Sequence, residues 1–143
     1  MPSREFYVPP GGPPPADPRN AEIYAKMGEE NIYRMLEDFY GELERSSIRH
    51  LFPGDMREAS HKSAAFFVFL LGGPPLYQQK HGAPMMRKRH LAFVIDENAR
   101  QVWLGCFRKT LEEADKKYQF PMEYFDSFWG FLDRFSLWMV NSK

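Results

Sequence analysis

The chain has a single cysteine, Cys106, among its 143 residues. One thiol excludes an internal disulfide and any zinc site built from several cysteines. It also excludes covalent attachment of a c-type haem, which needs two cysteines before a histidine. Chains without disulfides are typical of a reducing compartment, so we expect a cytoplasmic protein.

The chain also has no excess of charge of one sign and no long apolar run. Lys and Arg together number 19, as do Asp and Glu, and the formal net charge is +0. We therefore expect no nucleic-acid partner and no acidic membrane surface as partner. The longest apolar run, AAFFVFLLGG, is far shorter than the roughly 20 residues that span a membrane. The N-terminus has no apolar signal-peptide core, so a soluble protein is predicted.

Proline and glycine are concentrated near the N-terminus, where they fill most of residues 8–18. Such a stretch cannot form a helix or a central strand. We expect residues 1–20 to be a Pro/Gly-rich arm, which could pack on the domain or tether something else. Residues 21–143 have the length of one domain with its own core.

Beyond the arm, apolar residues recur at helical spacing and no strand alternation competes. One stripe covers residues 32–43, and a second helix is predicted over residues 56–71. Asp96 is a plausible N-cap for a third helix that runs to about Lys117. The sequence predicts an all-α domain of four substantial helices plus short ones.

Prolines and glycines also delimit the segments between these helices. Residues 76–86 are predicted to be a loop, and residues 87–92 a short turn that carries His90. Pro121 suits the first turn of the last helix. The other histidines, His50, His61 and His81, are expected at the surface, and Cys106 in the core.

His90 stands out among the four histidines because it lies between cations and an apolar segment. Arg87, Lys88 and Arg89 precede it, and LAFVI follows it. Haem has the same polarity, with apolar faces and an anionic propionate edge. Aromatic residues make up 16% of the chain, which fits a flat apolar ligand or simply a Phe-rich core. From these residues alone, a surface histidine beside solvated cations is an equally good interpretation.

The segments DFYGEL, LFP, GGPPLYQQKHGAPMMRKRHLAFVI and ARQVWLGCF, in this order, resemble the truncated haemoglobins of the second group. The resemblance runs from about Ile23 to the C-terminus and leaves the arm outside. It implies a truncated globin, a two-over-two helical sandwich, around non-covalent haem b (iron protoporphyrin IX). It also implies reversible binding of O2 and of other diatomics such as NO and CO.

The resemblance assigns a proximal role to His90, whose Nε2 would coordinate iron while Nδ1–H donates to a backbone carbonyl. Arg89, Lys62 and the Tyr77 hydroxyl match positions that pair with haem propionates. Exposed charges and loop packing are the alternatives. Phe66 and Phe67 would wall the interior, or simply pack in the core. The implied haem-binding set is Phe52, Lys62, Phe66, Phe67, Tyr77, Arg89, His90 and Phe93.

On the distal side, Tyr40 matches a tyrosine of the first long helix, and Trp103 marks the second group. A hydroxyl donor aimed at bound O2 favours the bound state by about 1.5–3 kcal/mol. Either residue could instead be a plain core aromatic. Ala59 and Ser63 are the second-helix positions expected over the iron, and both are small. Phe52 stands where many relatives have Tyr, which removes one possible donor.

A haem with Tyr and Trp donors would hold O2 firmly, which suits reaction better than oxygen transport. Oxidation of NO to nitrate or peroxidase-like activity, supported by a cellular reductase, is therefore an open possibility. A haem-based sensor or interaction module, in which the arm contacts a partner, is the alternative class. A monomer or a homodimer would be compatible with either reading.

Overall fold

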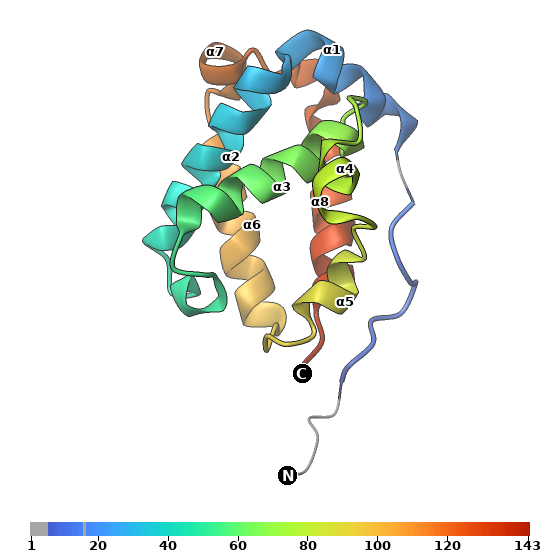
Figure 1. Cartoon of the computed structure of the whole chain (residues 1–143), viewed down its shortest axis with the longest axis vertical. Coiled ribbons are helices and arrows are strands. Elements are labelled where there is room, and N and C mark those ends of the chain that lie inside the picture. The colour runs from blue at the N-terminus through green and yellow to red at the C-terminus, as the bar shows by residue number, and fades with distance from the viewer. Residues whose placement is uncertain (1–5, 16) are drawn as a thin grey trace.

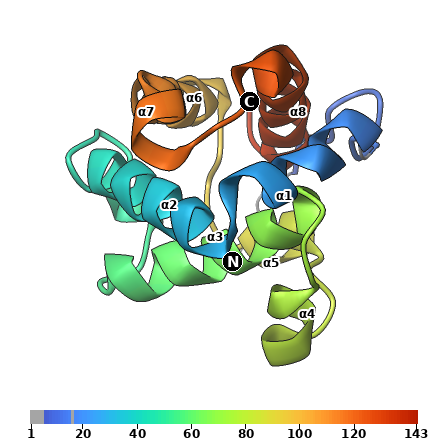
Figure 2. The ribbon, with the colours of Figure 1, turned by 90° about the horizontal axis from the view of Figure 1, so that it is seen from above.

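Four long helices form two layers in the computed structural model, which describes residues 6–15 and 17–143. In one layer α2 (Glu29–Glu44) crosses α3 (Met56–Leu70), and in the other α6 (Glu97–Leu111) lies beside α8 (Phe125–Met139) (Figures 1 and 2). No strand occurs in the described part of the chain. The prediction of an all-α domain with four substantial helices is confirmed.

Short helical segments connect the long ones. They are η1 (Pro18–Glu22), α1 (Ile23–Met27), η2 (Arg49–Leu51), α4 (Leu76–His81), α5 (Met86–His90), α7 (Ala114–Tyr118) and η3 (Met122–Tyr124). Among residues 6–15 and 17–143, no helix is long and apolar enough to cross a membrane. Residues 6–15 of the arm are irregular, as Pro and Gly require, and residues 1–5 and 16 lie outside the described residues.

Aspartates begin two of the long helices by satisfying backbone N–H groups that have no partner within the helix. The Asp55 carboxylate accepts a hydrogen bond from the Glu58 amide at 3.0 Å, and Asp96 accepts one from the Ala99 amide at 2.8 Å. The Asp96 N-cap is as predicted. These two caps fix where α3 and α6 start.

Aromatic rings from all four long helices meet in the core. Phe107 of α6 lies 4.1 Å from Phe39 of α2, 5.7 Å from Phe67 of α3 and 5.8 Å from Phe128 of α8, between ring centroids. Each of these rings is at most 2% exposed. Part of the aromatic content is therefore an ordinary core that holds the two layers together.

Three boundaries differ from the sequence prediction. The segment 76–86 is not all loop, because Leu76–His81 forms α4 between Pro75 and Gly82, whose φ is +78°. The third long helix ends at Leu111 and not near Lys117, since Glu113 takes a left-handed φ of +58° and starts a separate short helix. Pro121 precedes η3, so α8 begins only at Phe125.

A tight turn at Gly72 and Gly73 ends α3 and packs against the start of the domain. A Cβ on Gly72, whose φ is +100°, would lie 2.1 Å from the carbonyl oxygen of Ala21. The Tyr24 amide donates to the Leu71 carbonyl at 2.8 Å in the same region. Only glycine fits this position, because the backbone is left-handed and the neighbour is main chain.

We expect Gly72→Ala to lower the free energy of unfolding by about 2–5 kcal/mol, from left-handed strain and overpacking together. Gly82→Ala is the matched control, because Gly82 is also left-handed but has nothing within 4 Å of the added Cβ. That control should cost only about 1–2 kcal/mol. Urea unfolding measures both, and equal losses would contradict the close approach at Ala21.

Candidate functional site

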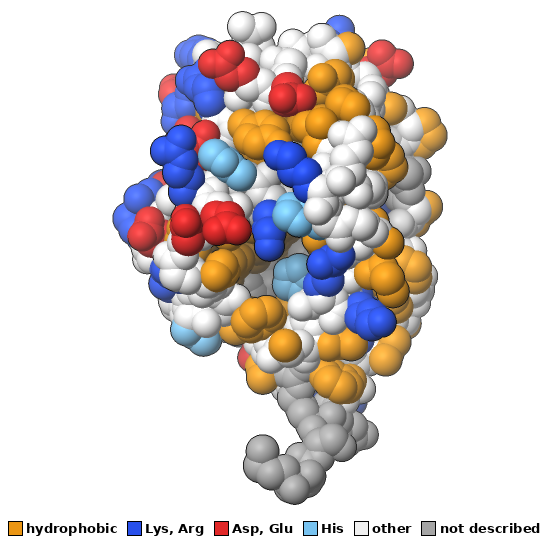
Figure 3. Space-filling model, viewed as in Figure 1, with side chains coloured by type: hydrophobic (Ala, Val, Ile, Leu, Met, Phe, Trp, Pro, Cys, Tyr) orange, Lys and Arg blue, Asp and Glu red, His pale blue; other side chains and the backbone are white. Residues whose placement is uncertain are grey.

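A cavity of about 380 Å³ lies between the two layers and opens at one face of the molecule. This volume lies within the range of roughly 300–1,000 Å³ that is usual for ligand sites. Figure 3 shows the hollow at the centre of that face, with a histidine in it and Lys or Arg side chains beside it. Helices α2, α3, α4, α5, α6 and α8 all contribute lining residues.

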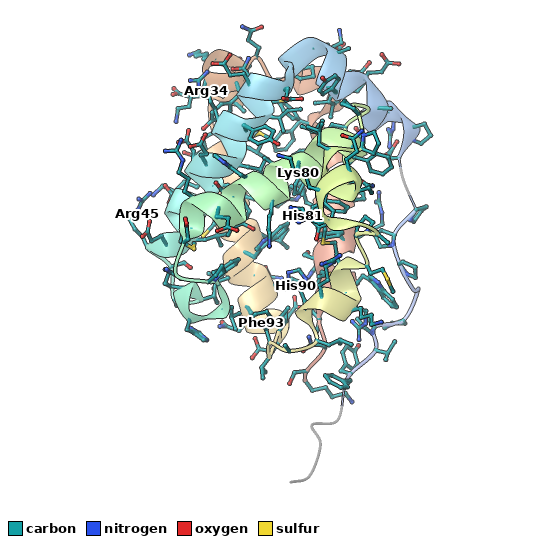
Figure 4. The ribbon with its side chains drawn as sticks, viewed as in Figure 1. Arg34, Arg45, Lys80, His81, His90 and Phe93 are labelled. Carbon is teal, nitrogen blue, oxygen red and sulfur yellow. The ribbon has the colours of Figure 1, made fainter. Side chains whose placement is uncertain are left out.

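His90 is the last residue of α5 and lines the cavity. Figure 4 shows it on α5, with Phe93 below it and His81 above it. Its Nδ1 lies 2.6 Å from the carbonyl oxygen of Met86. A carbonyl only accepts, so Nδ1 carries the proton and the Nε2 lone pair remains. Burial lowers the pKa of the His90 ring, which keeps this neutral form.

Tyr40 lines the cavity from α2. Burial raises the pKa of its hydroxyl, so the group keeps its proton, and the nearby Ser63 hydroxyl of α3 offsets part of that rise. The Tyr40 ring meets Phe52 edge-on, with centroids 5.7 Å apart. The cavity wall thus has a protonated phenol, a second hydroxyl one helix away, and the small Ala59 beside them.

Trp103 forms another part of the wall, from α6. Its ring packs edge-on against Phe39, with centroids 5.4 Å apart, and lies 6.5 Å from Phe135 of α8. The indole is half-buried and lines the cavity. Its N–H can only donate, so Trp103 and Tyr40 are two donor groups on one apolar cavity.

Charged residues of both signs stand at the mouth. Lys62 and Arg89 line it, as do the acidic Asp55 and Glu58. Arg89 also stabilises the segment before α5, because its guanidinium donates to the carbonyl of Pro84 at 2.6 Å and to two others nearby. The guanidinium carbon lies 5.5 Å from the centroid of the buried Tyr77 ring. An anionic ligand edge is therefore favoured on the Arg89 side.

Every site residue named from the sequence lines this one cavity. The structure brings together Tyr40, Phe52, Ala59, Lys62, Ser63, Phe66, Phe67, Tyr77, Arg89, His90, Phe93 and Trp103. This tests their proximity and leaves their individual roles as predictions.

Sequence reasoning missed the part of the wall that α8 supplies. Phe135, Ser136 and Met139 line the cavity, as does Arg100 of α6. Arg100 donates to Ser136 Oγ at 3.1 Å and pairs with Asp133 and Glu97. The apolar stripe of the last helix was visible in the sequence, but nothing there separates its core residues from its cavity residues.

The remaining histidines and Cys106 lie off the cavity wall. His50 is exposed, and His61 is 39% exposed with its Nε2 3.8 Å from Glu37. His81 is half-buried, with its ring 4.9 Å from that of Tyr77, so the surface prediction is only partly right for it. Cys106 is half-buried against the core.

The side chains that line the cavity fit haem better than they fit a bare metal ion. Within the described residues, no cluster of three His, Cys, Asp or Glu side chains could hold a metal ion. The cavity instead combines one neutral imidazole with aromatic walls, and its mouth carries Lys62 and Arg89 as well as acidic residues. That arrangement suits a cofactor whose ring supplies the other in-plane ligands and whose edge is anionic.

Comparison with known proteins agrees with this geometry. A model of the family described as bacterial-like globin matches residues 22–141. The group 2 truncated hemoglobin YjbI of Bacillus subtilis is 36% identical over 92 residues, covering 64% of this chain and 70% of that protein. The two-on-two hemoglobin-3 of Arabidopsis thaliana is 28% identical over 98 residues, covering 66% of this chain and just over half, 56%, of the plant protein.

Two solved structures extend the match to the fold. Phosphate-bound Hell's gate globin IV superposes with a TM-score of 0.80 and 33% identity, covering 99% of this chain and 85% of that one. The truncated oxygen-avid haemoglobin from Bacillus subtilis gives a TM-score of 0.73 and 33% identity, covering 82% of this chain and 98% of that one. The predicted resemblance and the two-over-two fold are confirmed.

Proposed function

Because the chain belongs to the bacterial-like globin family, whose members bind haem and through it oxygen, we propose that it holds haem b in this cavity and binds O2 and other diatomics reversibly. Ferrous haem supplies the iron centre that takes up such ligands. The single observation that carries the proposal is His90, a neutral imidazole in an aromatic cavity with Nδ1 held by the Met86 carbonyl.

His90 is the proposed iron ligand. The Met86 carbonyl fixes the tautomer and the ring orientation. The hydrogen bond at Nδ1 also makes the Nε2 lone pair more basic, and so a stronger iron ligand. Phe93 lies 6.5 Å from the imidazole between ring centroids and would limit its rotation. Arg89, Lys62 and Tyr77 are the proposed partners of the haem propionates, because all three line the cavity.

Tyr40 of α2, Ser63 of α3 and Trp103 of α6 are the proposed ligand-binding residues. The Tyr40 hydroxyl is protonated and Ser63 lies near it, so Ser63 is the residue proposed to orient it. Donors held in place in an apolar site stabilise partial negative charge on a diatomic ligand at little reorganisation cost. Ala59 of α3 has a small side chain, so it leaves room in the cavity for the ligand.

Absorption spectroscopy of the purified chain tests haem binding and coordination together. We expect a strong Soret band that shifts on reduction and shifts again when CO is added. His61 lies off the cavity, so a His61→Ala protein serves as the control and should give the same spectra. Absence of a Soret band after incubation with haem would refute the proposal.

Reaction with bound ligands, as opposed to delivery of O2, is a second candidate function. The observation in its favour is the pair of donors, Tyr40 and Trp103, which would slow the release of O2. Sustained NO consumption with stoichiometric nitrate, in the presence of O2 and a reductase, is the expected result if the chain is an NO dioxygenase. Release of O2 without any nitrate would leave binding as the function.

A further inference from the structure

The short helix that carries His90 is too small to be stable by itself. Isolated helices below about 12 residues are marginal in water, and α5 has five. Met85, which precedes it, is left-handed with φ of +41°, a conformation that costs a non-glycine residue about 1–2 kcal/mol. The position of His90 must therefore be set by ties from outside α5.

Arg87 supplies the first of these ties. Its Nη1 donates to the carbonyls of Trp138 at 2.5 Å and Val140 at 2.8 Å, and its Nη2 donates to the carbonyl of Tyr7 at 2.8 Å. The guanidinium carbon also lies 4.8 Å from the centroid of the Trp138 ring. One side chain of α5 thus binds both the end of α8 and the N-terminal arm.

Asn141 supplies the second tie and is fully buried. Its Nδ2 donates to the carbonyls of His90 at 3.3 Å and Phe93 at 3.1 Å, and its Oδ1 accepts from the Ile95 amide at 3.1 Å. Its own carbonyl accepts from the Tyr7 amide at 3.0 Å. The residue that holds the backbone of His90 is therefore bonded directly to the arm.

We propose that Arg87 and Asn141 are positioning residues that couple the N-terminal arm to His90. Together with Tyr7, Trp138 and Val140 they form what we name the proximal clamp. The inference rests on the proposed role of His90 as iron ligand. Four clamp residues lie within the globin match at residues 22–141, and Tyr7 of the arm lies outside it. The described residues of the arm then act on the cofactor site without lining the cavity.

Substitution of Arg87 by methionine tests the clamp in the full-length, haem-loaded protein. Methionine keeps an apolar stem against Trp138 and removes three hydrogen bonds. We expect haem transfer to excess apomyoglobin to accelerate about 10-fold, as when a group that orients a metal ligand is removed. The iron–histidine stretching band should also shift. Arg108→Met is the control, because Arg108 lies over Trp129, 5.6 Å from its centroid, and neither residue lines the cavity.

The arm itself is tested by a matched pair. Deleting residues 1–10 should move haem transfer and the iron–histidine band in the same direction as Arg87→Met. Tyr7→Phe should change neither, because Tyr7 joins the clamp through its main-chain N–H and carbonyl. If the deletion variant and the wild type show the same rate of haem transfer and the same iron–histidine band, the coupling to the arm is overturned.

Hydrogen exchange of the backbone amides over residues 86–95 separates this inference from the proposed function. In the chain without haem, Arg87→Met should exchange faster there than Arg108→Met. A wild type that takes up no haem counts against the proposed function, and exchange then decides on the clamp alone. Unchanged exchange overturns the clamp. A less stable variant whose iron–histidine band stays in place also overturns it, because Arg87 would then support the fold and not His90.

Discussion

Replacing His90 with glycine is expected to abolish iron coordination by the protein. The described cavity wall has no other histidine, since His50, His61 and His81 all lie off it. Removing even a group that orients a metal ligand costs about 10–100-fold in affinity, so losing the ligand itself should cost more. Haem that remains should be weakly held, with a Soret band typical of an unligated or water-ligated iron. Titration of the haem-free protein with haem measures the loss.

His81→Gly is the matched control for this substitution, because each histidine is the last residue of a short helix. It carries a similar backbone cost at a residue that does not line the cavity, although its ring lies 4.9 Å from that of Tyr77. Added imidazole should restore coordination in His90→Gly by filling the space that the side chain leaves, and should do nothing in His81→Gly. A His90→Gly protein with wild-type affinity and spectrum would falsify the assignment of His90.

The long helices could be predicted from the sequence because their causes are local. Apolar residues recur at helical spacing in each, and the Asp96 cap is a hydrogen bond made within four residues. The end of α6 could not be predicted, because Glu113 is left-handed without being glycine. That conformation depends on how α7 packs, which no pattern of neighbouring residues records. Helix α4 was missed because its six residues are too few to give a periodic signal.

The candidate site also has residues that could be predicted from the sequence and residues that could not. His90, Tyr40 and Trp103 were found because their residue types, in that order, resemble a known family. Ser136 and Met139 were missed because they reach the cavity only through the packing of α8 against the rest. The ties at Arg87 end on backbone carbonyls, and carbonyls are the same at every position of a sequence. Long-range contacts to the main chain are therefore the part of this site that needed a structure.

Tyr40→Phe is expected to speed the release of O2 by about 10- to 100-fold, the equivalent of the roughly 1.5–3 kcal/mol that a hydrogen bond to a charged group contributes. The substitution removes only the hydroxyl, so the edge-on contact with Phe52 should survive. Burial keeps the Tyr40 pKa above its usual value, so the effect should not depend on pH near neutrality. Stopped-flow mixing of the oxygenated protein with an O2 scavenger measures the release rate.

Tyr33→Phe provides the comparison, because Tyr33 lies on the same helix and outside the cavity wall. Its release rate should equal that of the wild type. The release rate of Ser63→Ala should fall between the two, because Ser63 is proposed to orient the Tyr40 hydroxyl. If Tyr40→Phe releases O2 no faster than Tyr33→Phe, Tyr40 does not hold the ligand, and Ser63 and Trp103 are the remaining proposed donors. Release rates of Trp103→Phe and Ser63→Ala would then show whether the indole N–H or the Ser63 hydroxyl holds the ligand.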